Sequence, residues 1–192
     1  MFATTLSPSQ GASHWYALRT TYGREKKAYD YLVSQHVTAF YPTLHVVRVK
    51  QGKRCHVEES RIPNVFFAYG TEQEISAYVF DNARLPYLRF YYRHRHEGSR
   101  IVREPLIVPD AQMESLRLVC AAEAQDIVTA DADDRRFAAG NRVLVTEGTF
   151  KGVTGIVARI HGQQRVAVVI EGVLAVATAY VPSAFLQRLD AE

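Results

Sequence analysis

The sequence has little that would place the chain in a membrane or an oxidising compartment. No apolar run approaches the roughly 18 residues that a membrane-spanning helix needs, and the N-terminus lacks the basic start and apolar stretch of a secretory signal. The two cysteines, Cys55 and Cys120, lie far apart in the sequence and form no CxxC pair. These absences argue against a membrane protein, a disulfide framework and a zinc ribbon. They predict a cytoplasmic protein with two reduced thiols.

Motifs of catalysis are missing as well. The chain contains no GxSxG, no HExxH and no pair of carboxylates in a plausible pocket, so we expect neither an enzyme nor a cofactor. The neighbours Cys55 and His56, and the run from Arg93 to His96, have spacings that fit no structural zinc pattern, so no metal site is expected. A small enzyme that carries a binding domain as an appendage remains an alternative, although no residue of the chain suggests itself as catalytic.

Charge is distributed unevenly along a chain whose formal net charge is only +3. Between Trp15 and Arg61 nine Lys and Arg residues stand against four acids, so the basic surplus is N-terminal. From Glu123 to Arg136 five acids stand against two arginines, which is typical of an acidic linker. We therefore predict a disordered lead-in over residues 1–13, a first domain over 14–120, a linker over 121–139 and a second domain over 140–190.

The first domain is predicted to mix strands and helices. WYALRT (15–20) favours a strand, and the following helix places Tyr29, Leu32, Val33 and His36 on one side. Segments 39–50 and 61–70 flank a turn at 51–54 and predict a long hairpin.

The rest of this domain predicts two further helices around one more strand. Thr71 and Glu74 have the spacing of a capping box, which predicts a helix over 72–84, and an aromatic strand follows over 85–93. A third helix, beginning near Asp110, would point Met113, Leu116 and Cys120 inward. The order βαββαβα is typical of a ferredoxin-like (split βαβ) sandwich, an α+β fold.

The second domain has short apolar runs separated by glycines, which predict a small all-β barrel. Its most specific segment is GNRVLVTEGTFKGVTGIVARI (140–160), which holds Gly148, Phe150, Gly152 and Gly155. A phosphate-binding loop is the rival interpretation, but the segment lacks both the Lys-Ser/Thr ending of a P-loop and the GxGxxG spacing. The segment resembles the KOW motif, which implies an SH3-like KOW barrel.

With the KOW segment in place, the first domain resembles the NGN domain of NusG-type transcription factors. WYALRTTYGREKKA resembles the opening strand and first helix of that family, and SRIPNVFFAY resembles its proline-containing strand. Pro63–Asn64, and IVP before the third helix, are closer to the specialised RfaH-like and UpxY-like members.

The resemblance implies a transcription elongation factor or antiterminator that binds RNA polymerase across its main cleft. Such a factor suppresses pausing or termination, for specific operons such as those for surface polysaccharides. The alternative is a KOW module that binds RNA or the ribosome without contacting the polymerase. The acidic linker and the apolar strand patch favour the first reading.

The family docks an apolar patch of its NGN sheet on the clamp helices of the largest polymerase subunit. The positions of this chain that match the patch or lie beside it are Tyr16, Ile62, Pro63, Val65, Phe67 and Phe90. An exposed apolar cluster on a sheet is a partner site because leaving it in water is unfavourable. The alternative is that these residues belong to the core, and strand alternation assigns about half of them there.

Two further surfaces follow from the resemblance. A second contact, across the cleft, falls on Ser76, Ala77 and Tyr78. The non-template DNA strand would meet a set that combines positive charge with an aromatic ring, as exposed bases require: Arg19, Thr21, Tyr22, Arg24 and Lys27. A solvated charged helix face is the alternative for this set, and the basic clusters Arg48–Arg54 and Arg93–His96 either line the same duplex or serve solubility.

KOW barrels of the family recruit the termination factor Rho or a small-subunit ribosomal protein through an apolar loop between two late strands. In this chain the loop corresponds to Ile170, Glu171, Gly172 and Val173. Glu171 and Val173 replace the aromatic residue and the arginine of the general factor, which argues against strong Rho recruitment. We expect a monomer without membrane contact.

Overall fold

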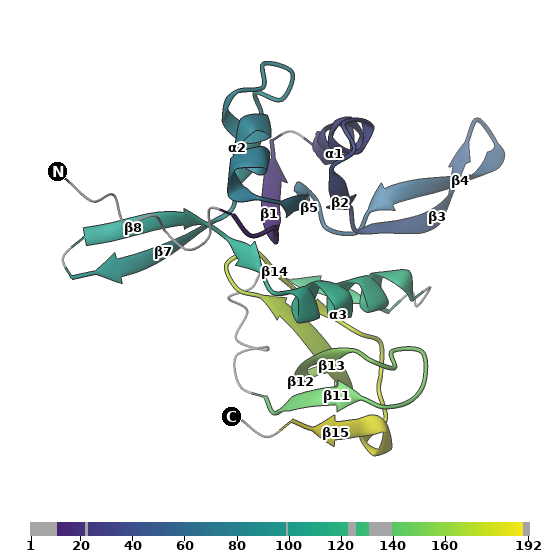
Figure 1. Ribbon diagram of the computed structural model, residues 1–192. Helices are drawn as coiled ribbons and strands as arrows, with labels where there is room; N and C mark the ends of the chain where they lie inside the picture. Colours follow the sequence, from purple (N-terminus) through teal and green to yellow (C-terminus); the bar gives the residue numbers. More distant parts are fainter. Residues whose placement is uncertain (1–10, 22, 99, 123–125, 131–139, 190–192) are drawn as a thin grey trace. The chain divides into compact units, whose positions relative to one another are not determined.

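The computed structural model describes residues 11–21, 23–98, 100–122, 126–130 and 140–189 (Figure 1). The chain divides into two compact units. The first unit comprises Met1–Tyr41 and Pro63–Pro109, and the second comprises Pro42–Ile62 and Asp110–Glu192. The division differs from the predicted boundary at residue 120, because the helix that begins at Asp110 groups with the C-terminal strands. Most of the predicted lead-in lies outside the described residues.

The first unit is built on a five-stranded antiparallel sheet. Its strands are β1 (His14–Thr20), β2 (Thr38–Phe40), β5 (Val65–Gly70), β6 (Leu88–Phe90) and β9 (Ile107–Val108). They are ordered β2-β5-β1-β6, with β9 also paired to β1. With α1 (Glu25–Ser34) between β1 and β2 and α2 (Glu72–Phe80) between β5 and β6, this is the predicted split βαβ arrangement. The α+β fold class is confirmed.

Both helices of the first unit cover the same face of this sheet. Ala28 and Leu32 of α1 and Ile75 and Val79 of α2 belong to one buried cluster. The strand residues of that cluster alternate along their strands and lie on one side of the sheet: Tyr16, Leu18, Phe66, Ala68, Leu88 and Phe90. We call this side the helix-covered face. The opposite side, the second face, receives neither helix.

The helix boundaries are partly as predicted. The capping box at α2 is confirmed, since the Glu74 amide donates to Thr71 Oγ1 and the Glu74 carboxylate accepts from the Thr71 amide at 2.8 Å. The helix ends at Phe80 and does not reach residue 84. In α1 the prediction that Val33 shares the apolar side of the helix with Leu32 is wrong, because Val33 is 44% exposed. The buried apolar residues of this helix are Ala28 and Leu32. His36 lies beyond the helix end with a φ of 63°.

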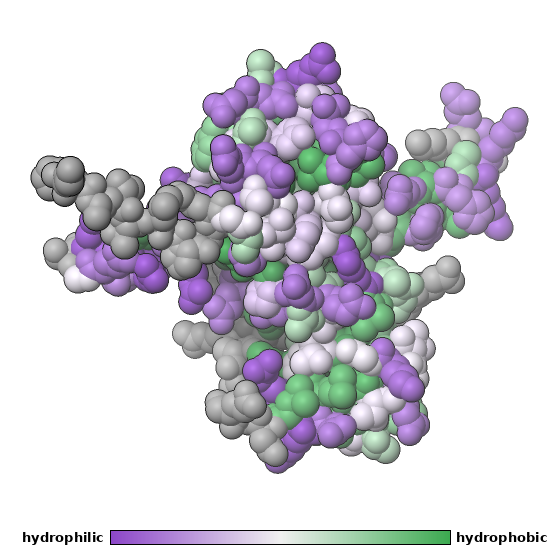
Figure 2. Space-filling model, viewed as in Figure 1, coloured by the Kyte–Doolittle hydropathy of each residue, from purple (hydrophilic) through white to green (hydrophobic). Residues whose placement is uncertain are grey.

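Two hairpins extend the chain between sheet strands. One is formed by β3 (Thr43–Lys50) and β4 (Lys53–Ser60), the other by β7 (Tyr92–Glu97) and β8 (Arg100–Pro105). The prediction that residues 61–70 form the second arm of the first hairpin is wrong, because β3 pairs with β4 and residues 65–70 pair with β1 and β2. The turn end of the β3–β4 hairpin is strongly hydrophilic, as Figure 2 shows.

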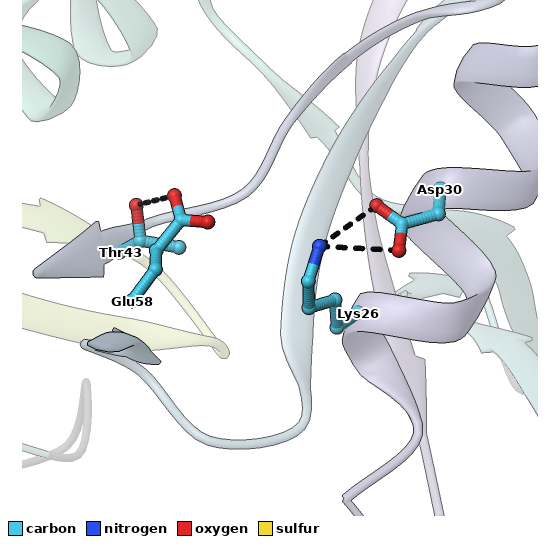
Figure 3. A network of polar contacts seen from close by, with 4 residues as sticks. All are labelled: Lys26, Asp30, Thr43 and Glu58. Atoms are coloured by element: carbon cyan, nitrogen blue, oxygen red, sulfur yellow. Dashed lines mark hydrogen bonds and ion pairs between the residues drawn. The ribbon is translucent and has the colours of Figure 1, made fainter. Parts of the chain in front are cut away.

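Surface polar pairs support these elements locally. Lys26 and Asp30 form an i,i+4 ion pair at 3.0 Å on α1, and Thr43 donates to Glu58 at 2.9 Å across the hairpin (Figure 3). A bidentate pair between Arg48 and Glu59 also crosses the hairpin. Exposed pairs of this kind contribute little to stability, because solvent screens the charges.

The second unit contains a six-stranded antiparallel sheet. Its strands are β10 (Val128–Ala130), β11 (Arg142–Val145), β12 (Thr154–Ile160), β13 (Gln163–Ile170), β14 (Leu174–Ala177) and β15 (Leu186–Arg188). Their order is β10-β14-β13-β12-β11-β15, so β10 and β15 are the ends of the path in the described part of the chain. The predicted all-β character is confirmed. A short 3-10 helix, Ser183–Phe185, precedes β15.

Two segments join this sheet from outside the predicted second domain. The helix α3 (Asp110–Ala121) contacts β12, β13 and β14, and its Ser115 hydroxyl accepts a hydrogen bond from the Thr154 amide at 3.0 Å. Strand β10 lies within the predicted linker and pairs with β14. The linker is therefore partly structured, because its Val128–Ala130 stretch is apolar enough to extend the sheet. Residues 123–125 and 131–139 of the linker lie outside the described residues.

Candidate functional site

The second face of the first-unit sheet is largely apolar. Its residues follow from the strand register, which places Phe40, Phe67 and Ala17 in one row across β2, β5 and β1. A neighbouring row contains Thr38, Tyr69, Trp15 and Val108. Trp15 contacts Tyr69 with ring centroids 5.3 Å apart, and Phe40 stacks on Phe67 at 6.3 Å. In the structure Trp15 and Phe67 are buried and Phe40 is half-buried.

The structure corrects two members of the predicted apolar patch. Tyr16 and Phe90 lie on the helix-covered face, where their rings meet edge to face at 5.7 Å. Residue alternation explains the error, because neighbours along a strand point to opposite faces. Burial raises the pKa of Tyr16 to about 12, with a smaller contribution from Glu72. Val65 and Phe67 do lie on the second face, and both are buried.

The remaining predicted patch residues lie at the start of β5. Ile62 is buried and Pro63 is exposed. Asn64 follows in a left-handed conformation with a φ of 64°, which asparagine tolerates better than most residues. Its side-chain oxygen accepts a hydrogen bond from the Gly23 amide at 3.1 Å, and its carbonyl accepts one from Thr20 at 3.0 Å. The Pro63–Asn64 turn therefore fixes the loop between β1 and α1.

That loop carries most of the predicted nucleic-acid residues, but the structure does not bring all of them together. Arg24 lies over the ring of Tyr87 at 5.0 Å, a residue of the helix-side core, and Lys27 is exposed on α1. Arg19 instead belongs to the second face, because it pairs with Val65 and Arg89. Thr21 is exposed, and Tyr22 lies outside the described residues.

The predicted second contact lies on α2 beside a depression in the first unit. Ser76 and Tyr78 are half-buried and Ala77 is exposed, while Tyr78 meets the Tyr31 ring at 6.5 Å. Ala77 and Tyr78 line an open pocket of about 520 Å³, together with residues from the end of α1 and from β2 and β5. Glu74 lies at the same pocket, and the hydrogen bonds it accepts from Thr71 lower its pKa.

The structure of the second unit explains why the motif of residues 140–160 needs its glycines. Gly148 and Gly152 have φ values of 79° and 91°, which favour glycine. Gly155 is needed for space, since a Cβ there would lie 2.4 Å from the Ala167 carbonyl oxygen. Phe150 is buried between these glycines, and the Gly152 amide donates to the Val145 carbonyl at 2.8 Å. The motif therefore shapes a tight hairpin.

The predicted partner loop forms the turn between β13 and β14. Ile170 is buried at the end of β13, and the Val173 amide donates to its carbonyl at 3.0 Å. Gly172 has a φ of 72°, and Glu171 is exposed at the turn. Glu171 therefore offers a charge to a partner, whereas Ile170 contributes to the core.

Sequence reasoning missed two arginines. Arg165 is 4% exposed and donates to the carbonyls of Asp126 and Thr178, so it ties the segment before β10 to the sheet. Nothing in the sequence distinguishes it from a surface arginine. Arg89 lies directly opposite Arg19 on the second face. Arg89 lies between Leu88 and Phe90 in the sequence, and strand alternation could have shown that its side chain points away from the core.

Other chemistry is sparse in the described part of the chain. Its His, Cys, Asp and Glu residues form no group of three that could hold a metal ion. Burial raises the pKa of the Cys120 thiol to about 11, an effect that Arg61 partly opposes. None of the described helices is long and apolar enough to cross a bilayer.

Comparison with known proteins gives two findings. The family model described as "Transcription termination factor nusG" matches residues 13–117, more than half of the chain. A solved structure reported as "Domain interaction in Thermotoga maritima NusG" is similar over 93% of this chain and 98% of that one, with 16% sequence identity and a TM-score of 0.43. The extent of the family match settles the assignment: the chain belongs to the NusG family of transcription factors.

Proposed function

We propose that the chain is an elongation factor that docks the second face of its first-unit sheet on the clamp helices of the largest RNA polymerase subunit. The bound protein suppresses pausing or termination by holding the main cleft closed. Its targets are specific operons, those for surface polysaccharides among them. The second unit remains available for another partner, either Rho or a small-subunit ribosomal protein, at the turn around Glu171.

The second face carries this proposal. Both helices of the first unit pack on the other side of the sheet, so these helices do not cover Trp15, Phe40 and Phe67. Burying apolar surface stabilises a complex by about 25 cal/mol per Å², so such a face favours a protein partner. Because Val65 and Phe67 are buried in the structure, the partner binds a conformation that exposes them.

The other surfaces support the same arrangement. Ser76, Ala77 and Tyr78 on α2 are the proposed contact with the opposite side of the cleft. Arg24 and Lys27, with Thr21, are the proposed contacts of the non-template strand, since exposed guanidinium and ammonium groups bind backbone phosphates. Tyr22 belongs to the same proposal but lies outside the described residues.

The test is a pull-down of purified elongation complexes by the wild-type chain and by Ile62→Asp/Val65→Asp. Two carboxylates in place of apolar side chains introduce polar groups into a desolvated interface, so the variant should lose docking. The matched control is Val47→Asp, which makes the same change at a hairpin residue that is 55% exposed. Circular dichroism must show that each variant is folded.

The outcomes separate the candidate functions. Retention of wild type and Val47→Asp, with loss of the double variant, supports docking through the second face. Equal retention of all three would move the docking surface elsewhere. Absence of wild-type binding would contradict the proposal and favour a KOW module that binds RNA or the ribosome.

A further inference from the structure

Two arginines of the second face stand directly opposite each other. Arg19 of β1 and Arg89 of β6 are partners in the antiparallel register, so their side chains leave the sheet on the same side. Cβ atoms of such partners are about 4.5–5.5 Å apart, and like charges at that spacing destabilise a sheet. Folding alone therefore disfavours this pair, and something else must explain it.

Neither arginine is neutralised within the described part of the chain. None of the ion pairs between described residues includes Arg19 or Arg89. Arg89 donates through Nη1 to the carbonyls of Pro86 and Leu88, at 2.9 and 2.6 Å. The guanidinium of Arg19 lies 5.9 Å from the centre of the Tyr91 ring. These contacts restrain both groups while both side chains stay exposed.

The arginine pair continues the apolar rows of the second face. Val65, Arg19 and Arg89 form one row across β5, β1 and β6, and the adjacent row contains Phe67 and Ala17. Phe67 and Val65 are buried in the structure, so a segment that docks on them binds a conformation that exposes them, and it then passes next to both guanidinium groups. A guanidinium binds a carboxylate through paired N–H groups, and such bonds are stronger than neutral ones.

We propose that Arg19 and Arg89 together bind a carboxylate of the polymerase segment that docks on the second face, and so select an acidic docking segment. The inference rests on the proposed function and extends it by naming the two residues that confer specificity. It also assigns Arg19 to protein binding and leaves Arg24 and Lys27 to the nucleic acid.

The geometry favours a protein carboxylate over a nucleic-acid phosphate. Arg24 is held against Tyr87, whose ring belongs to the helix-side core, whereas Arg19 leaves the sheet on the second face. A nucleic-acid strand that followed Arg24 and Lys27 would not share a face with Arg19.

The experiment compares two forms of RNA polymerase: core enzyme free of nucleic acid, and assembled elongation complexes. Dissociation constants are measured for the full chain, for Arg19→Glu/Arg89→Glu, for Arg19→Gln/Arg89→Gln and for Arg89→Lys. The control Arg159→Glu makes the same charge reversal at an exposed residue of the second unit. The glutamine variants remove the charge without introducing repulsion, and thermal melting shows whether each variant is folded.

We expect the double glutamate variant to bind core enzyme and elongation complexes about 10-fold more weakly, or worse, because a charged interface pair typically contributes that much or more. The glutamine variant should show a smaller loss in the same direction. Arg89→Lys keeps the charge but lacks the paired N–H groups, so it should show a partial loss, and Arg159→Glu should bind nearly as wild type.

Three results would overturn the inference. A loss confined to elongation complexes would assign the pair to a nucleic-acid phosphate. Unchanged binding of both double variants would show that the pair has no ligand on the polymerase. If the wild type fails to bind core enzyme, both the proposed docking and this inference fail. If the wild type binds and only Ile62→Asp/Val65→Asp abolishes the binding, the docking stands but the two arginines take no part in it.

Discussion

At the scale of single residues, the helix-side core contains polar atoms that its packing leaves unpaired. The hydroxyls of Tyr16 and Tyr87 are both buried, and neither has a hydrogen-bond partner among the described residues. A buried hydroxyl without a partner costs about 1–3 kcal/mol relative to a paired or solvated one. The ring of Tyr16 therefore stabilises the core, whereas its oxygen opposes folding.

Tyr16→Phe should leave the free energy of unfolding at pH 7 unchanged or raise it, because the substitution removes only the unpaired hydroxyl. Since the folded pKa of Tyr16 is about 12 and the ordinary value is 10, the wild type loses stability as the pH rises from 10 to 12. The variant should lose less over that range. Urea unfolding at pH 7, 10 and 12 measures both effects, and a loss of stability at pH 7 would show that the hydroxyl has a partner.

Gly155→Ala should destabilise the second unit by about 1–3 kcal/mol, because its Cβ would lie 2.4 Å from the Ala167 carbonyl oxygen, and overpacking against backbone forces the strands apart. Chemical denaturation of the wild type and of Gly155→Ala gives the difference in their free energies of unfolding. Gly11→Ala is the control, since nothing lies within 4 Å of a Cβ there. Equal stability of Gly155→Ala and wild type would contradict the close approach of β12 and β13.

Some of these residue features could be predicted from the sequence and others could not. The glycine pattern at 148, 152 and 155 was sufficient to predict a tight hairpin. Glycine is favoured at 148 and 152 by their positive φ and at 155 by the close approach of the neighbouring strand. The partner of each glycine could not be predicted. The assignment of Tyr16 and Phe90 to the surface failed because a strand with apolar residues on both faces shows no alternation of hydrophobicity.

At the scale of elements, local signals predicted the starts of elements better than their pairing. The capping box located the first turn of α2 because its hydrogen bonds join residues three apart. The pairing of residues 61–70 was missed because it depends on contacts with β1, some 50 residues earlier in the sequence. Strand β10 was missed because the short Val-Thr-Ala stretch lies in an acidic segment that resembles a linker.

Thr71→Ala should lower the stability of the first unit by about 1 kcal/mol, because it removes the side-chain cap of α2. The loss should shrink as the pH falls through the acid range, because the hydrogen bonds from Thr71 lower the pKa of Glu74 and protonation of Glu74 weakens that stabilisation in the wild type. Thermal melts at pH 7 and pH 4 test both statements. Ser76→Ala on the same helix is the control and should be close to neutral.

At the scale of the whole molecule, binding to the polymerase and action on it should be separable. In the proposed arrangement the second face makes one contact and α2 the other, and the clamp is held closed only when both are made. Ala77 is exposed, so a glutamate there does not disturb the core of the first unit.

Ala77→Glu should therefore bind elongation complexes within a few-fold of wild type while losing most of the reduction in pause lifetime. A transcription assay on a template with a defined pause site, run beside a binding assay, measures both quantities. Gln73→Glu, an equally exposed position on α2, is the control. If Ala77→Glu still shortens pauses as wild type does, this part of α2 does not contact the polymerase.

The base of the β3–β4 hairpin bears on how proteins of this kind diversify. The hairpin leaves the first unit after Tyr41 and returns at Pro63, and the Arg61 amide closes its base by donating to the Pro42 carbonyl at 2.8 Å. Within the described part of the chain its strands pair with each other and with no other strand, in a sheet of two strands. Insertions, deletions or exchange of this ribbon therefore leave the register of the main sheet intact, and evolution can vary its length and charge independently of the fold that carries it.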